Sequence, residues 1–352
     1  MNIAVLVSGG VDSSVALRLL HDEGHDLTAF YLKVWLEEEV LSFAGDCPWE
    51  EDVGFVRQTC EELGVPLEIV PLQGDYYELV VEMVLAQLRA GRTPSPDIFC
   101  NRRIKFGAFL EGPGSDFERV ASGHYARLLP GSQGVRLLRG VDSTKDQSYF
   151  LSHLTQEQVA RVLFPVGGLP KSEVRELAAR YALPSYDRKD SQGICFLGKI
   201  DYREFIAFHL GQREGPIVDI DSCETLGQHH GYWFYTIGQR YGLGLAGGPW
   251  YVVGKDIASN TVQVTHADHR REHSRDTFDI GDLNWICPPA RHEEGEVLLK
   301  LRHGPNLAEA RIESLGGDRL RVHLAQADPG VAPGQHAVIY NGEECLGGSI
   351  IC

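Results

Sequence analysis

The feature that most constrains the fold is a glycine-rich turn near the start of the chain. Residues 3–7 form a continuous apolar run, residues 8–14 read Ser-Gly-Gly-Val-Asp-Ser-Ser, and residues 15–20 have the composition of a helix. Glycine allows a sharp turn and the close approach of an anion, and the amides at a helix start attract phosphate. The run therefore predicts a phosphate-binding loop between a buried strand and a helix.

The carboxylate of Asp12 is the unusual member of this loop, because it repels phosphate unless a cation lies between them. A magnesium ion carried by a nucleotide would resolve the repulsion. The alternative is an ordinary strand–helix turn with an Asp or Ser cap. The loop lacks the Gly-Lys-Ser/Thr of the Walker pattern and instead resembles the loop of ATP-cleaving synthetases that release pyrophosphate.

The length, charge and composition of the chain limit which binding partners and which cellular compartment are expected. A chain of 352 residues can hold two or three domains, and its formal charge of -16 argues against non-specific adhesion to nucleic acid. An RNA substrate needs only a local basic surface; residues 102–105 and 188–189 are basic clusters, although for each we favour a solvated face. Without a membrane-length apolar segment or room for a signal peptide before residue 3, we expect a cytoplasmic protein without a membrane partner.

The order of predicted elements indicates three domains. Strands near 27–34 and 67–70 alternate with helices over 48–63 and about 77–88, which predicts a parallel sheet covered on both faces and a ligand site at the carboxyl ends of its strands. Short alternating strands after residue 232 predict a small β-barrel. The predicted domains are 1–165 (nucleotide-binding), 166–231 (small central domain) and 232–352 (barrel).

Two of the eight cysteines lie in unusual surroundings. Apolar spacing predicts that a helix starts near Cys100, after a proline-containing segment that breaks regular structure up to Asp97. A thiol at a helix start beside Arg102 and Arg103 should have a lowered pKa, with Asp97 within reach as an acid or base. A buried structural cysteine with Asp97 as a helix cap is an equally supported alternative.

Cys195 lies between glycines in a polar loop, which favours a reactive thiol. Cys60 instead belongs to the apolar stripe of the helix over 48–63, so we predict that it is core. Because no Cys-x-x-Cys pair occurs, a cysteine zinc site is not expected. His124 follows a glycine at a predicted strand end, where ligand contact and a structural role are equally supported.

Six segments together resemble the tRNA-specific 2-thiouridylase family, in the same order and almost end to end. They read SGGVDSS (8–14), TPSPDIFCNRRIKFGAFLE (93–111), SGHYAR (122–127), KDQSYFL (145–151), DSQGICFLG (190–198) and YTIGQRYGLG (235–244). The resemblance implies an α/β adenine-nucleotide α-hydrolase-like (PP-loop) domain with a parallel sheet, a small central domain and a C-terminal β-barrel.

The resemblance also implies the reaction. ATP, with Mg²⁺, would adenylate the 2-carbonyl oxygen of the wobble uridine (position 34) in tRNA, and a persulfide sulfur would replace that oxygen with release of AMP and pyrophosphate. The implied partners are the anticodon stem-loop of tRNA and a persulfide donor protein or cysteine desulfurase.

Individual residues take roles from the same resemblance. Cys100 would be the nucleophile, Cys195 would carry the persulfide, and the two would form a transient disulfide, while Asp97 would act as acid or base. ATP would be bound by Leu6, Val7, Ser8, Gly9, Gly10, Val11, Asp12, Ser13, Leu32 and Gly123. Contacts to tRNA would come from Ser95, Pro96, Asp97, His124, Lys145, Asp146, Gln147, Arg302, His303 and Gln335.

Three positions depart from the family pattern. The family usually has Asn at Ser95, Met at Leu32 and an aromatic residue at His303. Two other functions remain open: another ATP-pyrophosphatase-type enzyme (an amide-forming ligase or a thiolase of a different tRNA position), and a non-catalytic ATP-dependent tRNA-binding protein. The ligase would need neither Cys100 nor Cys195.

Overall fold

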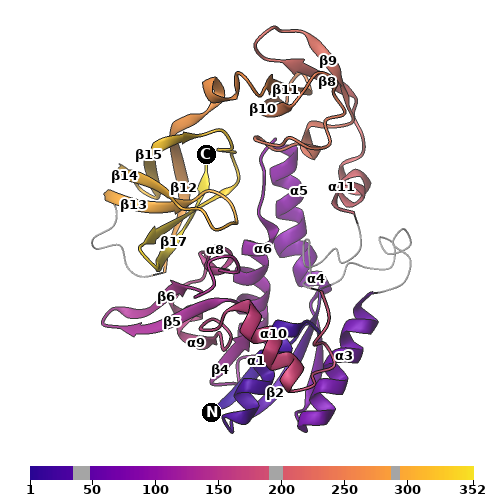
Figure 1. Ribbon diagram of the computed structural model, residues 1–352, viewed down its shortest axis with the longest axis vertical. Helices are drawn as coiled ribbons and strands as arrows, with labels where there is room; N and C mark the ends of the chain where they lie inside the picture. Colours follow the sequence, from indigo (N-terminus) through magenta and orange to yellow (C-terminus); the bar gives the residue numbers. More distant parts are fainter. Residues whose placement is uncertain (35–47, 190–200, 287–293) are drawn as a thin grey trace.

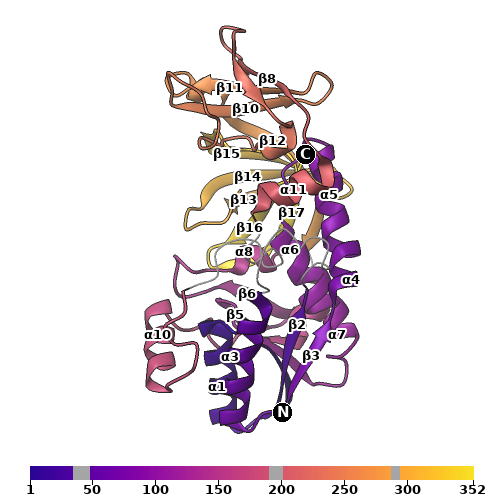
Figure 2. The same ribbon diagram turned by 90° about the vertical axis from the view of Figure 1, so that its right-hand side faces the viewer.

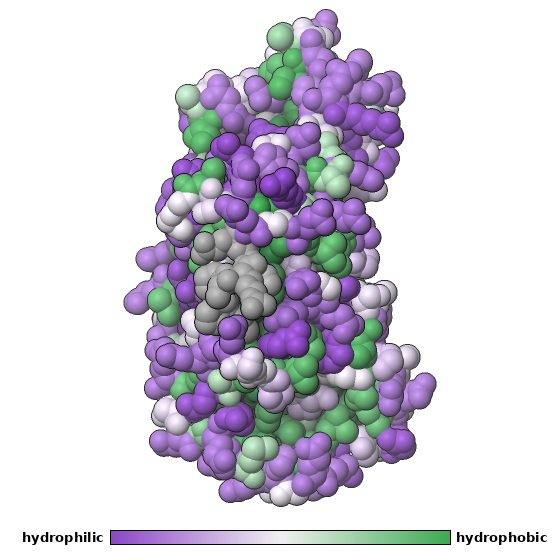
Figure 3. All heavy atoms as spheres, turned by 90° about the vertical axis from the view of Figure 1, so that its left-hand side faces the viewer, coloured by the Kyte–Doolittle hydropathy of each residue, from purple (hydrophilic) through white to green (hydrophobic). Residues whose placement is uncertain are grey.

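The computed structural model describes residues 1–34, 48–189, 201–286 and 294–352. Three parts follow one another along the long axis (Figures 1 and 2): an α/β part at the N-terminal end, a β-barrel in the middle and a small sheet at the far end. Among the described helices, none is long and apolar enough to cross a membrane. Hydrophilic side chains predominate on the face shown in Figure 3, where apolar ones form small scattered groups.

The N-terminal part is built on a parallel sheet, as predicted. Its strands follow the order β3-β2-β1-β4-β7, and each neighbouring pair is parallel. The bounds are β1 (Asn2–Leu6), β2 (Asp26–Lys33), β3 (Leu67–Pro71), β4 (Arg119–Ser122) and β7 (Val162–Leu163).

Both faces of this sheet are buried, which explains the continuous apolar run at β1. Ile3 and Val5 pack into one core with α1 (Val11–Asp22) and α3 (Pro48–Leu63), whereas Ala4 and Leu6 belong to a second core on the other face. Cys60 is 3% exposed within the first core, so its predicted core role is confirmed.

The second core is covered by two runs of helical turns. The first run comprises α4 (Gln73–Tyr76), the π-helix η1 (Tyr77–Val81) and α5 (Glu82–Arg89); the second comprises α6 (Pro96–Phe99), the π-helix η2 (Cys100–Ala108) and α7 (Phe109–Glu111). The prediction that helix begins near Cys100 is wrong: it begins at Pro96, since proline is well suited to the first helical position.

Three more helices complete this part: α8 (Ser148–Leu151), α9 (Gln156–Arg161) and α10 (Lys171–Arg180). The apolar side of α10 packs against α1, where Val174 and Ala178 share a core with Val11 and Val15. This contact joins α10 to the N-terminal sheet, whereas the predicted boundary after residue 165 assigns it to the central domain.

The small sheet at the far end has the order β10-β11-β8-β9 and is preceded by α11 (Tyr202–Leu210). Its strands are β8 (Gly215–Asp219), β9 (Thr225–His229), β10 (Trp250–Asp256) and β11 (Thr261–His266), with the 3-10 turn η3 (Tyr232–Phe234) between β9 and β10. The sequence prediction assigned β10 and β11 to the barrel. They belong here because β11 pairs in parallel with β8, with Val262 opposite Ile217.

The C-terminal strands form the predicted barrel after the 3-10 turn η4 (Arg270–His273). It contains β12 (Arg275–Trp285), β13 (Gly295–Lys300), β14 (Ala308–Gly316), β15 (Arg319–Asp328), β16 (His336–Asn341) and β17 (Glu344–Ile351), and pairing of β12 with β17 closes it. The hairpin β5 (Ala126–Gly131)–β6 (Gly134–Arg139) extends this sheet, since Leu137 lies opposite Cys345. The barrel is therefore joined directly to the N-terminal part.

Two histidines are buried where these parts meet. His153 and His336 are both 0% exposed, their ring centroids lie 4.6 Å apart, and Phe99 packs beside both. Within the described chain their ring nitrogens have no hydrogen-bond partner. Burial lowers the pKa of both rings, that of His336 to about 3.

This pair predicts a loss of stability in acid. Below a pH of about 6.5 the unfolded chain binds protons that the buried rings reject. Each pH unit below this value should therefore cost about 1.4 kcal/mol for His336, whose pKa falls to about 3, and His153 should add a loss of the same sign. Urea unfolding between pH 7 and 4.5 should show a shallower decline for His336→Leu than for the unaltered protein. The exposed His230, replaced by leucine, should leave the decline unchanged; equal slopes for all three proteins would contradict the assignment.

Candidate functional site

The glycine-rich loop lies at the carboxyl edge of the parallel sheet. Leu6 at the end of β1 lies opposite Phe30 of β2 and Ser122 of β4, so the segments that follow these strands gather at one edge. A Cβ atom on Gly123 would lie 2.7 Å from the Ser13 nitrogen, so a side chain there would displace the loop. Leu32, near the end of β2, shares this edge. The fold thus brings the segments predicted to bind ATP together.

The local geometry of the loop fits an anion. Helix α1 starts at Val11, and its N-cap Gly10 provides no side-chain cap, so the first amides of the helix lack intrahelical acceptors. The Ser13 hydroxyl accepts a hydrogen bond from the Ser8 amide at 3.1 Å and closes the turn. Gly9 has a φ of +75°, and a Cβ there would lie 2.7 Å from the Asp52 carbonyl oxygen. The turn therefore requires glycine at this position.

The carboxylate of Asp12 has two partners that the sequence analysis did not identify. Its Oδ1 accepts hydrogen bonds from the Tyr125 hydroxyl and the Lys171 ammonium, both at 2.7 Å. In the sequence, the only signal for Lys171 is its place at a helix start after Pro170. The described chain contains no group of three His, Cys, Asp or Glu side chains that could hold a metal. A magnesium ion at the loop would therefore be held chiefly by the phosphates of the nucleotide, with the Asp12 carboxylate as the nearby protein oxygen donor.

Arg188 holds the loop from the other side. Its guanidinium donates to the Gly9 carbonyl at 2.8 Å and to the Asp52 carboxylate at 2.7 Å, and it lies 4.5 Å from the centre of the Phe55 ring. The prediction of a solvated face at 188–189 is therefore wrong for Arg188, because the chain after α10 returns to the loop. Tertiary contacts, rather than local sequence, decide this placement.

Cys100 is buried and does not lie at the start of its helix. It is 2% exposed in the second core and follows a complete helical turn that begins at Pro96. The thiol therefore does not lie at a helix start, and its role as the nucleophile stays a prediction. Asp97 is partly exposed three residues earlier, and Cys195 lies outside the described residues. Arg103 donates to the Leu79 carbonyl at 2.7 Å and lies over the Phe99 ring.

The segment predicted to face the target base meets the barrel. The Tyr149 hydroxyl interacts with the Ser95 side chain, and the Thr93 amide donates to the Pro333 carbonyl at 2.8 Å. The Phe150 ring stacks on His303, with centroids 4.7 Å apart. The predicted tRNA-contact segments at 95–97, 302–303 and 335 are thereby brought toward one another, although they lie far apart in the sequence.

Other predicted tRNA contacts already have partners within the protein. His124 shares a 2.7 Å hydrogen bond with the Ser122 hydroxyl, and burial lowers its pKa well below the ordinary value. The Gln147 side-chain oxygen accepts from the Tyr125 amide at 2.9 Å, and Arg302 pairs with Asp328 at 2.7 Å. Lys145 is partly exposed, whereas Pro96 is buried. Asp146 is 2% exposed, so the geometry argues against its predicted direct contact with RNA.

The comparisons with known proteins agree over the whole chain. Family models described as a tRNA methyl transferase HUP domain, a tRNA methyl transferase PRC-barrel domain and an aminomethyltransferase beta-barrel domain match residues 1–199, 203–266 and 275–351. The tRNA-specific 2-thiouridylase MnmA 1 of Bacteroides thetaiotaomicron is 41% identical, with 99% of this chain and 98% of that protein covered. The tRNA-specific 2-thiouridylase MnmA of Parabacteroides distasonis is 42% identical, with 100% and 99% covered.

Similarity to solved structures is much weaker. The U34-tRNA thiolase NcsA from Methanococcus maripaludis matches with a TM-score of 0.34 and 16% identity, covering 59% of this chain and 65% of that chain. A match of this size gives no basis for transferring a function or a site.

Proposed function

The chain belongs to the tRNA-specific 2-thiouridylase family, and from this membership we propose that it converts a uridine of tRNA to 2-thiouridine, with ATP as the activating substrate and the wobble position as its target. The observation that carries the proposal is the single sheet edge that gathers the glycine-rich loop, Leu32 and Gly123. The two segments around Ser95 and His303 support a site for the base at the contact with the barrel.

In the activating step, the 2-carbonyl oxygen of uracil attacks the α-phosphate of ATP, and pyrophosphate leaves. The first-turn amides of α1 and the Lys171 ammonium, which lies beside Asp12 of the loop, would bind the phosphates. Magnesium bound with ATP would supply further positive charge for the leaving pyrophosphate. Asp97 is proposed as the general acid or base that transfers a proton to or from the target uracil.

In the transfer step, Cys195 carries a persulfide that a donor protein has loaded. Attack of the Cys100 thiolate on the inner sulfur forms a Cys100–Cys195 disulfide and releases the outer sulfur, which attacks C2 of the adenylated base. AMP leaves with the former carbonyl oxygen, and an external dithiol must reduce the disulfide before the next cycle.

The direct test is mass spectrometry of nucleosides from tRNA incubated with the protein, ATP, magnesium and a persulfide source. We expect 2-thiouridine at position 34 and AMP in equal amounts. ATP cleavage with amide formation, or thiolation at another tRNA position, would favour another pyrophosphatase-type enzyme. Tight tRNA binding without product would favour the non-catalytic alternative.

Lys171→Met should lower kcat/KM for ATP by about 10- to 100-fold, because it removes a charge-assisted donor from the loop. The measurement is ATP-dependent pyrophosphate release at several ATP concentrations. Lys189→Met removes an equal charge from an exposed position and should stay within about twofold of the unaltered protein. Equal activity of both variants would exclude Lys171 from phosphate binding.

A further inference from the structure

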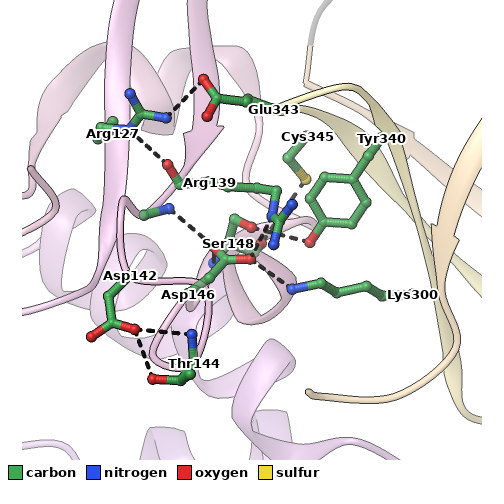
Figure 4. Close-up of polar contacts among 11 residues, drawn as sticks. Arg127, Arg139, Asp142, Thr144, Asp146, Ser148, Lys300, Tyr340, Glu343 and Cys345 are labelled. Atoms are coloured by element: carbon green, nitrogen blue, oxygen red, sulfur yellow. Dashed lines mark hydrogen bonds and ion pairs between the residues drawn. The ribbon is translucent and has the colours of Figure 1, made fainter. Parts of the chain in front are cut away.

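A lysine and an aspartate form a fully buried ion pair where the N-terminal part meets the barrel. Nζ of Lys300, the last residue of β13, lies 2.6 Å from Oδ2 of Asp146, and both side chains are 0% exposed. Figure 4 shows the lysine extending from the barrel toward the loop that precedes α8. Removing two charges from water costs about as much free energy as their attraction returns. Stability alone therefore gives little reason for a charged pair at this contact.

The aspartate ties its own loop together as well as the barrel. Oδ1 of Asp146 accepts from the backbone amides of Gly140 and Ser148, both at 3.1 Å, and Oδ2 accepts from Nε of Arg139 at 3.2 Å. Burial acts to raise the pKa of Asp146, but the Lys300 ammonium and the hydrogen bonds hold it below its ordinary value. The carboxylate is therefore charged and saturated by contacts inside the protein.

Predicted tRNA contacts flank both members of the pair. Lys145 and Gln147 adjoin Asp146 in the chain, and Arg302 and His303 follow shortly after Lys300. The His303 ring stacks on the Phe150 ring of α8 at a centroid distance of 4.7 Å. The pair thus links two segments from different parts of the molecule at the place where they lie side by side.

We infer that Lys300 and Asp146 are positioning residues for tRNA: their ion pair fixes residues 302–303 against residues 145–150, so that one RNA strand can meet both segments. Asp146 then acts through its neighbours and does not itself contact RNA. This inference rests on the proposed function for the identity of the ligand. A nearby solvated pair, Arg127–Glu343 at 3.1 Å with Glu343 72% exposed, can contribute little to such positioning.

The test is a double-mutant cycle on tRNA affinity with Lys300→Met, Asp146→Asn and the double variant. Lys300→Met should weaken tRNA binding at least about tenfold, with ATP affinity changed less than about twofold. Because both substitutions break the same link, the double variant should bind tRNA no more weakly than Lys300→Met alone. Because the double variant has no buried charge left without its partner, its melting temperature should recover part of the loss seen in Lys300→Met. Additive losses in tRNA affinity would overturn the inference, since they indicate that the two residues act on tRNA binding independently and not through one link.

Two further measurements separate this inference from the proposed function. Amide hydrogen exchange over residues 145–151 and 301–303, without RNA, should accelerate about tenfold or more in Lys300→Met. Glu343→Gln at the solvated pair should change neither exchange nor tRNA affinity by more than about twofold. If the unaltered protein forms no 2-thiouridine, the proposed function fails while the exchange result still tests the positioning. Unchanged exchange and affinity in Lys300→Met would overturn the inference whatever the reaction.

Discussion

Replacing Cys100 by serine is expected to slow 2-thiouridine formation at least about 1,000-fold, while ATP-dependent release of pyrophosphate stays within a few-fold. A serine hydroxyl is not ionised at neutral pH and cannot form the disulfide that releases the sulfur. The substitution changes little volume at a side chain that is 2% exposed, so the fold should persist with a loss of about 1–3 kcal/mol. Single-turnover analysis of tRNA nucleosides, with pyrophosphate release measured in parallel, provides the comparison.

The matched control is Cys60→Ser. Cys60 is also buried within a helix, at 3% exposed, and burial raises its thiol pKa to about 11. Its replacement should cost a similar amount of stability and leave thiolation within about twofold. If the two variants behaved alike in the thiolation assay, Cys100 would be a core cysteine and the sulfur-transfer step would need another thiol.

The second large effect is expected for Gly9→Ala, which should lower kcat/KM for ATP at least about 100-fold. At a φ of +75° an alanine is strained by about 1 kcal/mol, and its Cβ would lie 2.7 Å from the Asp52 carbonyl oxygen. The loop would have to move away from Asp52 and from Arg188, which bonds the Gly9 carbonyl. Calorimetric titration with ATP, together with thermal unfolding, separates loss of binding from loss of fold.

Gly24 provides the control for backbone strain alone. It has nearly the same φ, +77°, but a Cβ there would meet no atom within 4 Å. Gly24→Ala should therefore lose about 1 kcal/mol of stability and keep its ATP affinity. Equal loss of ATP affinity in both variants would show that general destabilisation, and not the loop, explains the effect at Gly9.

Local sequence was sufficient where one short segment contains the whole physical cause. The apolar run at β1 requires burial on both faces, and Gly-Gly before an apolar helix requires a turn at a sheet edge, so the loop and the parallel sheet were predictable. The helix over Pro48–Leu63 was predictable from its stripe, with Cys60 in the core. The capping box of Thr155 and Gln158 is equally local and is present at α9.

Local sequence misled where a residue's surroundings come from elsewhere in the chain. The segment around Cys100 predicted a helix that starts at this thiol, yet the helix begins four residues earlier and the side chain enters the core. The strands β10 and β11 alternate like those of the barrel, but their partner is β8. Alternation identifies a strand and its buried face, whereas the choice of neighbour depends on long-range pairing.

By itself, the sequence determined the nucleotide loop, the parallel sheet, the barrel and, through its motifs, the family. Only the tertiary structure placed Lys171 and Arg188 at the loop and paired Lys300 with Asp146. The physical reason is that a phosphate-binding turn depends on neighbours in the chain, while the partner of a charge depends on which distant segments fold against it. A lysine that is exposed to solvent and a lysine that pairs with a buried carboxylate look the same in a sequence. Only the packing of distant segments distinguishes them.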